Sequence, residues 1–250
     1  MPEAIFRRPD PALRYNRLLD AAGIEPALQL RLDAVRVRIA DRTLAAVQRV
    51  GRGRALDIGA GSLAFAAEFA SYFTSYTSLD YEVRSQRLGV QGDGQRLPFA
   101  ANTFDTLISV DVLEHVPHPW EMLAEIERVL APGGCAILVT PFFFWAHEEP
   151  ADFYRLSKYG LALLCRELEL EVVSMEPTCG FIASLGLLGT VAITRLLHRW
   201  PAVLRPVLLA SRAFQLSVLL FLDDRIDRSK RFAQGHLLMA RKRPTTQENE

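Results

Sequence analysis

The chain has 250 residues, of which 50% are hydrophobic and 23% are charged, which is enough for one large domain with a buried core. This composition excludes intrinsic disorder and a fibrous repeat. The balance of 29 basic and 29 acidic residues gives no support for nucleic acid as a partner. Because Cys135, Cys165 and Cys179 form no C-x-x-C pair, we expect reduced thiols in a cytoplasmic protein, with no metal site.

Along the chain, residues 1–53 are predicted to form an N-terminal helical cap, because apolar residues such as Leu28, Leu32 and Val35 recur near helical spacing. The first residues contain no apolar segment, so no secretory signal is expected. Residues 54–177 alternate short apolar runs with helical patterns, which is typical of a Rossmann-like α/β core with helices on both faces of a mostly parallel sheet. The expected strands are 54–58, 76–79, 86–90, 104–110, 135–140 and 170–175, and the expected helices are 62–73, 120–130 and 157–168.

The last part of the chain differs in pattern. Residues 178–233 are apolar and predict a helical insertion. Residues 234–243 then supply the seventh strand of the core, which is expected at Gly235–Arg241, and residues 244–250 are expected to form a flexible polar tail.

The sequence of residues 178–233 is compatible with several roles for this predicted helical insertion. The uncharged run Pro177–Thr194 is about 18 residues long, the threshold for crossing a bilayer. The equally long run Val129–Ala146 contains Pro-Gly-Gly, so length alone does not predict a span. Between Arg195 and Arg231, eight basic residues outnumber three acidic ones. A lid over the substrate, a homodimer element and a peripheral contact with an anionic membrane surface all fit this pattern.

A strand that runs into two glycines is the strongest local signal. Residues 55–64 read A-L-D-I-G-A-G-S-L-A, and glycines at 59 and 61 permit a tight turn and a close approach of ligand to backbone beside a helix N-terminus. This pattern also fits a dinucleotide-binding fingerprint. Asp57 distinguishes a dinucleotide from S-adenosylmethionine as the ligand. Its carboxylate would repel the pyrophosphate of a dinucleotide and attract the ammonium and sulfonium of S-adenosylmethionine. The alternative is that Asp57 only caps the turn.

Five motifs follow one another at ordinary spacing: LDIGAGS (56–62), SLDY (78–81), GDGQRLPF (92–99), FDTLISVDVLEHVPHP (104–119) and RVLAPGGCAILVTP (128–141). Together they resemble the class I S-adenosylmethionine-dependent methyltransferases of the small-molecule type (methyltransferase type 11-like). The resemblance covers about a third of the chain tightly and implies that S-adenosyl-L-methionine is the cofactor.

The resemblance also implies the residues of the cofactor site. The glycine loop would wrap the methionine part with Asp57 at its amino group, Asp80 would bind the ribose hydroxyls and Tyr81 would lie against the adenine ring. Asp93 and Gly94 would contact the adenine amino group, and Asp111 would lie near the transferred methyl. The full implied set is Asp57, Gly59, Ala60, Gly61, Asp80, Tyr81, Asp93, Gly94 and Asp111.

The segment after the fifth strand is predicted to line the acceptor pocket, because ligands of open α/β sheets bind beyond the carboxyl ends of the strands. Residues 142–155 read FFFWAHEEPADFYR. His147 is predicted to act as a catalytic base for an acceptor hydroxyl. The predicted substrate-binding residues are Phe144, Trp145, Tyr154 and Arg155. A purely structural loop, with Arg155 paired to Asp152 or Glu149, is the alternative.

These patterns predict an enzyme that transfers a methyl group, most simply to an oxygen of a small-molecule, sugar or lipid-linked acceptor. An NAD-type Rossmann oxidoreductase is the first alternative, against which Asp57 and the later motifs argue. A module that binds the cofactor without catalysis is the second. The neutral charge balance and the absence of an Asn-Pro-Pro-Tyr-type motif disfavour RNA methylation.

Overall fold

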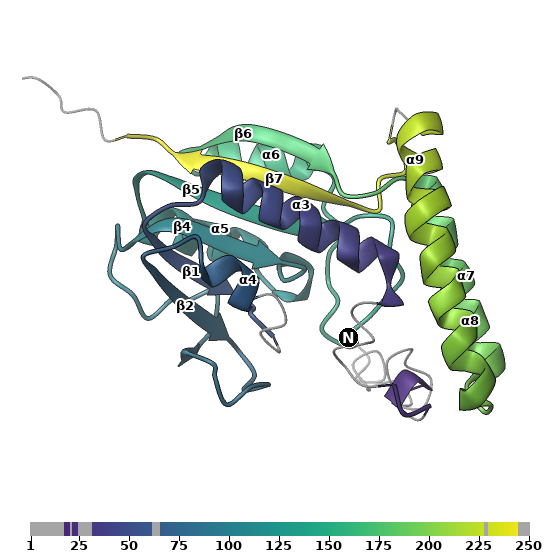
Figure 1. The fold of residues 1–250 in the computed structure, drawn as a ribbon. Helices are drawn as coiled ribbons and strands as arrows, with labels where there is room; N and C mark the ends of the chain where they lie inside the picture. The colour runs from purple at the N-terminus through teal and green to yellow at the C-terminus, as the bar shows by residue number, and fades with distance from the viewer. Residues whose placement is uncertain (1–17, 21, 25–31, 62–65, 228–229, 245–250) are drawn as a thin grey trace, which may run out of the picture. The chain divides into compact units, whose positions relative to one another are not determined.

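A seven-stranded sheet organises the larger part of the chain in this computed structural model, which describes residues 18–20, 22–24, 32–61, 66–227 and 230–244 (Figure 1). The strand order is β3–β2–β1–β4–β5–β7–β6. The pairs from β3 to β5 are parallel, and β7 is antiparallel to β5. The strands are β1 (Arg54–Ile58), β2 (Ser75–Asp80), β3 (Val90–Gln91), β4 (Phe104–Val110), β5 (Leu130–Pro141), β6 (Leu170–Pro177) and β7 (Gly235–Lys242). The predicted Rossmann-like α/β fold is confirmed.

One strand prediction is wrong. The sequence predicts a strand at 86–90, but the structure has only the two residues of β3, Val90–Gln91. The preceding residues turn instead, because Leu88 N donates to the Ser85 carbonyl at 3.2 Å and Arg87 N donates to Ser85 Oγ at 3.2 Å. These local hydrogen bonds compete with a sheet ladder. The other predicted strands are present, and β5 is longer because helix α5 passes directly into it.

The helices follow from local signals. Pro119 occupies the first turn of α5, where its missing N–H costs nothing, and Ser157 caps α6 by accepting from Gly160 N at 3.1 Å. The helical elements are α3 (Ala34–Val50), α4 (Ala66–Ala70), η3 (Leu113–His115), α5 (Pro119–Val129), α6 (Lys158–Glu167), α7 (Phe181–Leu197), α8 (Pro201–Phe214), η4 (Gln215–Leu219) and α9 (Leu220–Ile226). Leu28, residues 62–65 of the helix expected at 62–73 and residues 245–250 of the expected tail lie outside the described residues.

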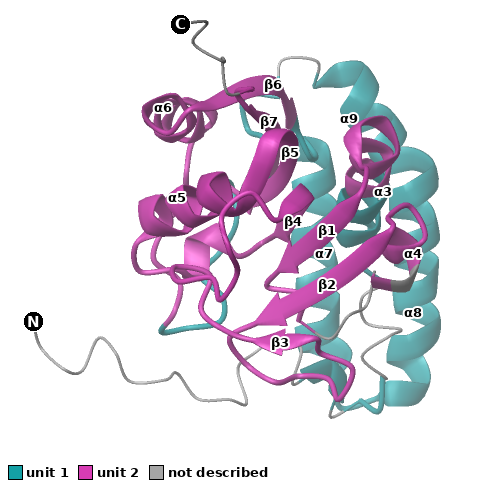
Figure 2. Cartoon of the chain, turned by 90° about the vertical axis from the view of Figure 1, so that its left-hand side faces the viewer, with its two compact units in different colours: residues 1–41, 143–150, 177–234 teal, residues 42–142, 151–176, 235–250 magenta. Residues whose placement is uncertain are grey.

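The chain divides into two compact units (Figure 2). The sheet unit comprises residues 42–142, 151–176 and 235–250. In it, α5 and α6 cover one face of the sheet, and α4 lies on the other. Buried side chains such as Leu56, Leu107 and Leu138 from the strands pack with Met122 of α5 and Leu161 of α6. This core holds the carboxyl ends of β1, β2 and β4 in register, and the predicted cofactor site lies there.

The helical unit comprises residues 1–41, 143–150 and 177–234. It contains α7 and the continuous helix α8–η4–α9, which occupy most of residues 178–233. Leu204 and Leu208 of α8 pack with Leu19 and Ile24 from the N-terminal segment. By length and composition, one helical stretch among the described residues, Pro201–Ile226, could cross a membrane.

Candidate active site

The loop after β1 has a backbone that only glycine tolerates at its first position. Gly59 has φ +75°, and a Cβ at this residue would lie 2.2 Å from Val112 Cγ2. Gly59 N and Ala60 N both donate to the Leu79 carbonyl, at 2.8 and 3.1 Å, so the loop is fixed against the end of β2. Gly61 also has a positive φ, of +56°, but a Cβ at this residue would lie 4.0 Å from the Gly59 carbonyl oxygen, its nearest neighbour among the described residues. Within the described part of the chain, the loop therefore leaves space for a ligand at Gly61.

Asp57 presents a buried carboxylate next to this loop. It is the fourth residue of β1 and is buried, and Tyr76 of β2 donates a hydrogen bond from its hydroxyl to Asp57 Oδ2. Burial raises the pKa of Asp57 from 3.8 to about 6; the bond from Tyr76 lowers it, and the nearby charge of Asp80 raises it further. A carboxylate whose charge is disfavoured by burial gains most from a cationic ligand.

Asp80 joins the loop after β1 to the loop after β2. Its Oδ2 accepts from Gly61 N at 2.7 Å and its Oδ1 accepts from Glu82 N at 2.8 Å. Because a carboxylate oxygen can accept two hydrogen bonds, both oxygens retain capacity for the hydroxyls of a diol. The structure thus brings Asp57, Gly61 and Asp80 together at the ends of adjacent strands.

The remaining predicted cofactor residues follow on the same edge of the sheet unit. Tyr81 is 73% exposed, which leaves its ring accessible for stacking against a flat base. Gly92 N donates to the Asp80 carbonyl at 3.0 Å and so ties the loop of Asp93 and Gly94 to β2. Asp111 has φ +54°, and its N–H donates to the Val139 carbonyl at 2.9 Å, just beyond β4.

These residues fit a ligand that combines a cation, a diol and a flat base. The buried acid suits an ammonium, the bridging carboxylate suits ribose hydroxyls, and the exposed ring suits adenine. A pyrophosphate would meet two carboxylates, at Asp57 and Asp80, and like charges at this range repel. The donor set therefore matches S-adenosylmethionine better than a dinucleotide.

Comparison with known proteins agrees with this geometry. Residues 56–138 match the methyltransferase domain family. An uncharacterized methyltransferase from Mycobacterium sp. (strain JLS) is 33% identical over 148 residues, which are 55% of this chain and 54% of that protein. Residues 56–138 of this chain are thus similar to a methyltransferase domain. The chain spans about half the length of the curated relative that it matches.

Solved structures share the fold of this methyltransferase domain. The [4+2]-cyclase SpnF has a TM-score of 0.58 at 19% identity and covers 84% of this chain and 81% of its own. Phosphoethanolamine N-methyltransferase 2 from Haemonchus contortus, in complex with S-adenosyl-L-methionine, has a TM-score of 0.55 at 15% identity. The match covers 95% of this chain and 61% of that protein. Since one fold serves a cyclase and an N-methyltransferase, the fold alone does not select the reaction.

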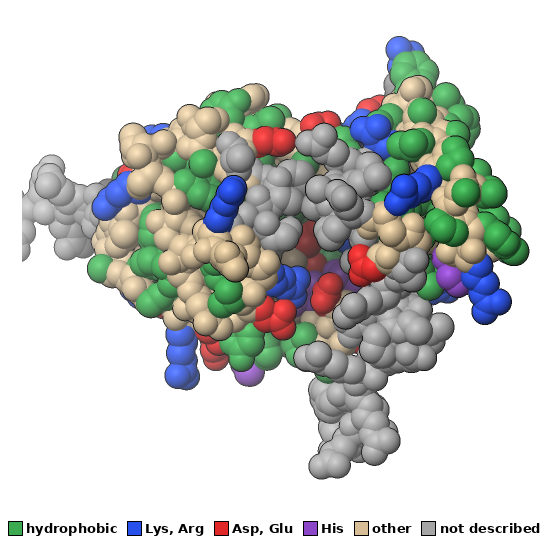
Figure 3. Space-filling model, turned by 60° about the horizontal axis from the view of Figure 1, so that its bottom comes forward, with side chains coloured by type: hydrophobic (Ala, Val, Ile, Leu, Met, Phe, Trp, Pro, Cys, Tyr) green, Lys and Arg blue, Asp and Glu red, His purple; other side chains and the backbone are tan. Residues whose placement is uncertain are grey.

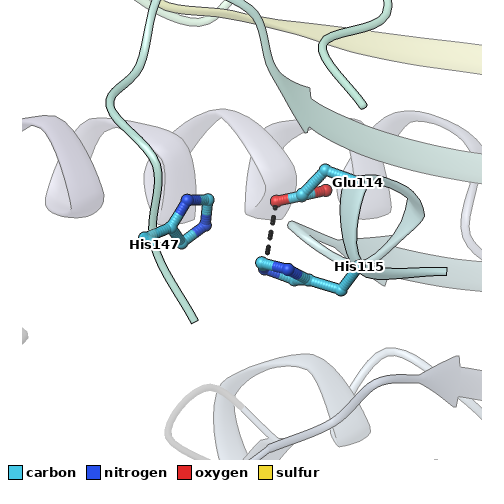
Figure 4. A group of neighbouring side chains, drawn as sticks. All are labelled: Glu114, His115 and His147. Carbon is cyan, nitrogen blue, oxygen red and sulfur yellow. Dashed lines mark ion pairs between the residues drawn. The ribbon is translucent and has the colours of Figure 1, made fainter. Parts of the chain in front are cut away.

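Beyond β4, the methyltransferase domain contains a buried carboxyl group. Glu114 of η3 is 1% exposed, and burial raises its pKa. His115 Nε2 lies 3.6 Å from Glu114 Oε1 (Figure 4), and His115 Nδ1 lies 2.5 Å from the Ala151 carbonyl oxygen. Each ring nitrogen of His115 thus lies near an oxygen atom of the protein.

One predicted substrate residue, Tyr154, is anchored to this turn, and another, Arg155, is paired with Asp152 nearby in sequence. Phe153 N and Tyr154 N donate to the Glu114 carbonyl at 2.8 and 3.3 Å, and the Tyr154 hydroxyl donates to the Pro117 carbonyl at 3.1 Å. Arg155 forms a bidentate pair with Asp152, at 2.5 and 2.7 Å. The pairing that the sequence leaves as an alternative is therefore present, and an acidic acceptor would have to compete with Asp152 for this guanidinium.

The other predicted acceptor residues belong to the helical unit. The ring of Phe144 stacks on Trp145 with 4.1 Å between centroids and meets His147 edge-on at 5.0 Å. His147 Nδ1 lies 3.3 Å from the Trp145 carbonyl oxygen. Phe143 N anchors this segment by donating to the Gln234 carbonyl at 3.1 Å. The aromatic side chains and the predicted base thus form one local cluster.

Three residues of the site were not predicted. Tyr76 holds Asp57, Val112 closes the space at Gly59, and Glu114 is a second buried acid. The sequence contains a signal for Glu114, since it is an acid between apolar residues in L-E-H-V. Tyr76 could have been found from strand register, because Tyr76 pairs with Ala55, two residues before Asp57. Nothing in the sequence pairs Val112 with Gly59.

Proposed function

We propose that this chain binds S-adenosylmethionine and transfers its methyl group to an oxygen of a small-molecule, sugar or lipid-linked acceptor. The observation that carries the proposal is the buried carboxylate of Asp57 beside the glycine loop, with Asp80 bridging the next strand. The absence of a disulfide among Cys135, Cys165 and Cys179, all described and all buried, supports a cytoplasmic location.

When bound, the cofactor supplies a methyl group activated by its sulfonium. Asp57 would hold the ammonium, the amides of the glycine loop would face the methionine part, and Asp80 would orient the ribose. These residues position the methyl carbon for in-line attack by an acceptor oxygen, and such positioning supplies most of the rate. The acceptor oxygen would gain the methyl group and lose its proton, while Asp57, the glycine loop and Asp80 would hold the cofactor and its thioether product in place.

A hydroxyl acceptor must also lose its proton, and we assign this step to His147. If its Nδ1–H donates to the Trp145 carbonyl, Nε2 retains the lone pair that accepts the proton. Phe144 and Trp145 would supply apolar contacts, and Tyr154 and Arg155 would bind the polar part of the acceptor. Loss of a general base typically costs about 100-fold or more in kcat.

Calorimetric titration tests the cofactor assignment. We expect S-adenosylhomocysteine to bind the purified protein and NAD not to bind. Asp80→Ala should weaken S-adenosylhomocysteine binding by about 1.5–3 kcal/mol, the scale of a hydrogen bond to a charged group. Asp105→Ala is the matched control, because Asp105 accepts from Arg54 N at the opposite end of the strands. Binding of NAD instead would favour the oxidoreductase.

A screen of acceptors with the wild-type protein then tests the chemistry. Once an acceptor is found, His147→Ala should lower kcat about 100-fold or more and leave the affinity for S-adenosylhomocysteine unchanged. His198→Ala, in the turn between α7 and α8, is the control and should keep full activity. Turnover within about threefold of wild type for His147→Ala would remove His147 from the mechanism. Cofactor binding without turnover of any acceptor would favour a binding module.

A further inference from the structure

The helices of the helical unit expose apolar side chains in regular rows. Leu185, Leu188 and Leu196 of α7 are spaced by helical repeats, and Leu209, Phe214 and Phe221 follow along α8–η4–α9. We call these six residues the apolar stripe. Each is between 45% and 72% exposed. Over these helices, Figure 3 shows hydrophobic side chains in green interspersed with basic ones in blue.

The polar side chains of the same helices face one another. Gln215 Nε2 donates to Thr190 Oγ1 at 2.6 Å and to Ser211 Oγ at 3.0 Å. Thr194 and Thr190 are buried as well. The interior of these helices is therefore mixed, because apolar side chains such as Leu187 and Leu220 are buried beside the polar ones. The candidate spanning stretch Pro201–Ile226 is only 22% buried, so it is not a core helix.

The acidic residues of this region are occupied internally. Asp223 is buried; it accepts from Gly180 N at 2.8 Å and from Ala183 N at 3.2 Å, and it pairs with Lys230. Asp227 accepts from Phe181 N, and Asp224 pairs with Arg38. The negative charges therefore cap α7 or neutralise basic groups of the same unit.

Basic side chains meanwhile border the apolar stripe. The guanidinium of Arg225 lies 4.9 Å from the ring centre of Phe221. The other exposed arginines stand at the α7–α8 turn and after α9, at Arg195, Arg199, Arg205 and Arg231. Among the described residues, none of these five arginines forms an ion pair. The exposed surface thus combines an apolar stripe with a positive border.

We propose that α7, α8, η4 and α9 lie flat on an anionic lipid surface, with the apolar stripe inserted and the arginines at the headgroups. A second copy of the chain fits poorly, because two such positive surfaces would repel each other. A spanning hairpin fits poorly as well, because Arg195, Arg199 and Arg205 would have to cross the bilayer. Leu204 and Leu208 are also covered by the chain's own residues. The proposal does not depend on the methyl transfer.

Vesicle sedimentation of the full chain tests this docking. Wild type should sediment with phosphatidylglycerol vesicles, remain in solution with phosphatidylcholine vesicles and be released by high salt. Leu185→Gln and Leu188→Gln should each weaken the partition about fivefold, since about half of each side chain is exposed. Arg225→Gln should also weaken it about fivefold. Leu163→Gln is the matched control, because Leu163 of α6 is 46% exposed and outside the stripe.

Circular dichroism and the thermal unfolding midpoint of each variant show whether the fold is intact, and light scattering reports the oligomeric state. Loss of sedimentation in the stripe variants alone supports the proposal. Equal sedimentation of Leu185→Gln and Leu163→Gln would overturn it. A wild-type dimer that Leu185→Gln dissociates, with no vesicle binding, would show an interface between copies instead. Resistance to release by salt and alkaline carbonate would show a spanning segment.

Discussion

Asp57→Asn separates a cofactor-binding acid from a turn cap. The substitution keeps the size of the side chain and an oxygen that can accept from the Tyr76 hydroxyl, but it removes the charge. Burial is the main cause of the rise in the pKa of Asp57 from 3.8 to about 6. This rise corresponds to about 3 kcal/mol by which the folded protein disfavours the ionised carboxylate.

The sign of the effect follows from this rise. A carboxyl group whose pKa is higher in the folded state stabilises the protein below pH 3.8, and this stabilisation is lost as the pH rises through about 6. The side chain in Asp57→Asn does not titrate, so the stability of this variant does not fall in this way as the pH rises. The stability of the variant relative to wild type should therefore increase by about 2.4 kcal/mol between pH 4 and pH 7.5, because a small part of the full effect is already present at pH 4. Thermal unfolding of both proteins without cofactor at the two pH values measures this difference.

The affinity of wild type for S-adenosylhomocysteine should rise with pH, whereas its stability relative to Asp57→Asn falls. Because the ionised carboxylate binds the ammonium, the Kd of wild type for S-adenosylhomocysteine should rise about tenfold from pH 7 to pH 5, whereas Asp57→Asn should bind weakly at both. Tyr76→Phe removes the bond that lowers the pKa of Asp57, so it should move this pH dependence upward. A stability difference that is independent of pH, with unchanged affinity, would show that Asp57 only caps the turn.

Three further outcomes are expected. In thermal unfolding without cofactor, Gly59→Ala should destabilise the protein clearly more than Gly61→Ala, because a Cβ at Gly59 would clash with Val112, whereas Gly61→Ala should cost only about 1 kcal/mol for its positive φ; equal losses of stability would contradict the packing argument. Asp223→Ala should lower the free energy of opening of α7, measured by amide hydrogen exchange, by about 3–5 kcal/mol, because it leaves the charge of Lys230 without its buried partner. Asp224→Ala removes the more exposed ion pair with Arg38 and should lower the same free energy by less than about 1 kcal/mol. Burial raises the pKa of Cys165 to about 11, so a disulfide reagent at pH 8 should label it only after unfolding, and rapid labelling of the native protein would refute its burial.

The order of short apolar runs and helical patterns predicted the α/β class and most of the strands, because local periodicity and glycine positions are written directly in the chain. The bounds of β1 and β4 agree with the prediction, since both strands are mostly buried and each is followed by a residue with positive φ, Gly59 and Asp111. The prediction of a strand at 86–90 was wrong because Ser85 accepts a hydrogen bond from Arg87 N and forms a turn. Each of these residues alone is compatible with a strand, so the sequence pattern does not reveal the turn. The cofactor loop was predictable for the same local reason.

Contacts between residues distant in sequence were decided only by the tertiary structure. Strand register places Tyr76 against Asp57, and a turn after β4 brings Val112 to Gly59. The pairing of Arg155 with Asp152 was one of several partners that the sequence allowed. For residues 178–233, the sequence determined apolar helices with a basic excess. Which side of each helix is exposed depends on how Gln215 meets Thr190 across the hairpin, and helical periodicity does not encode that pairing.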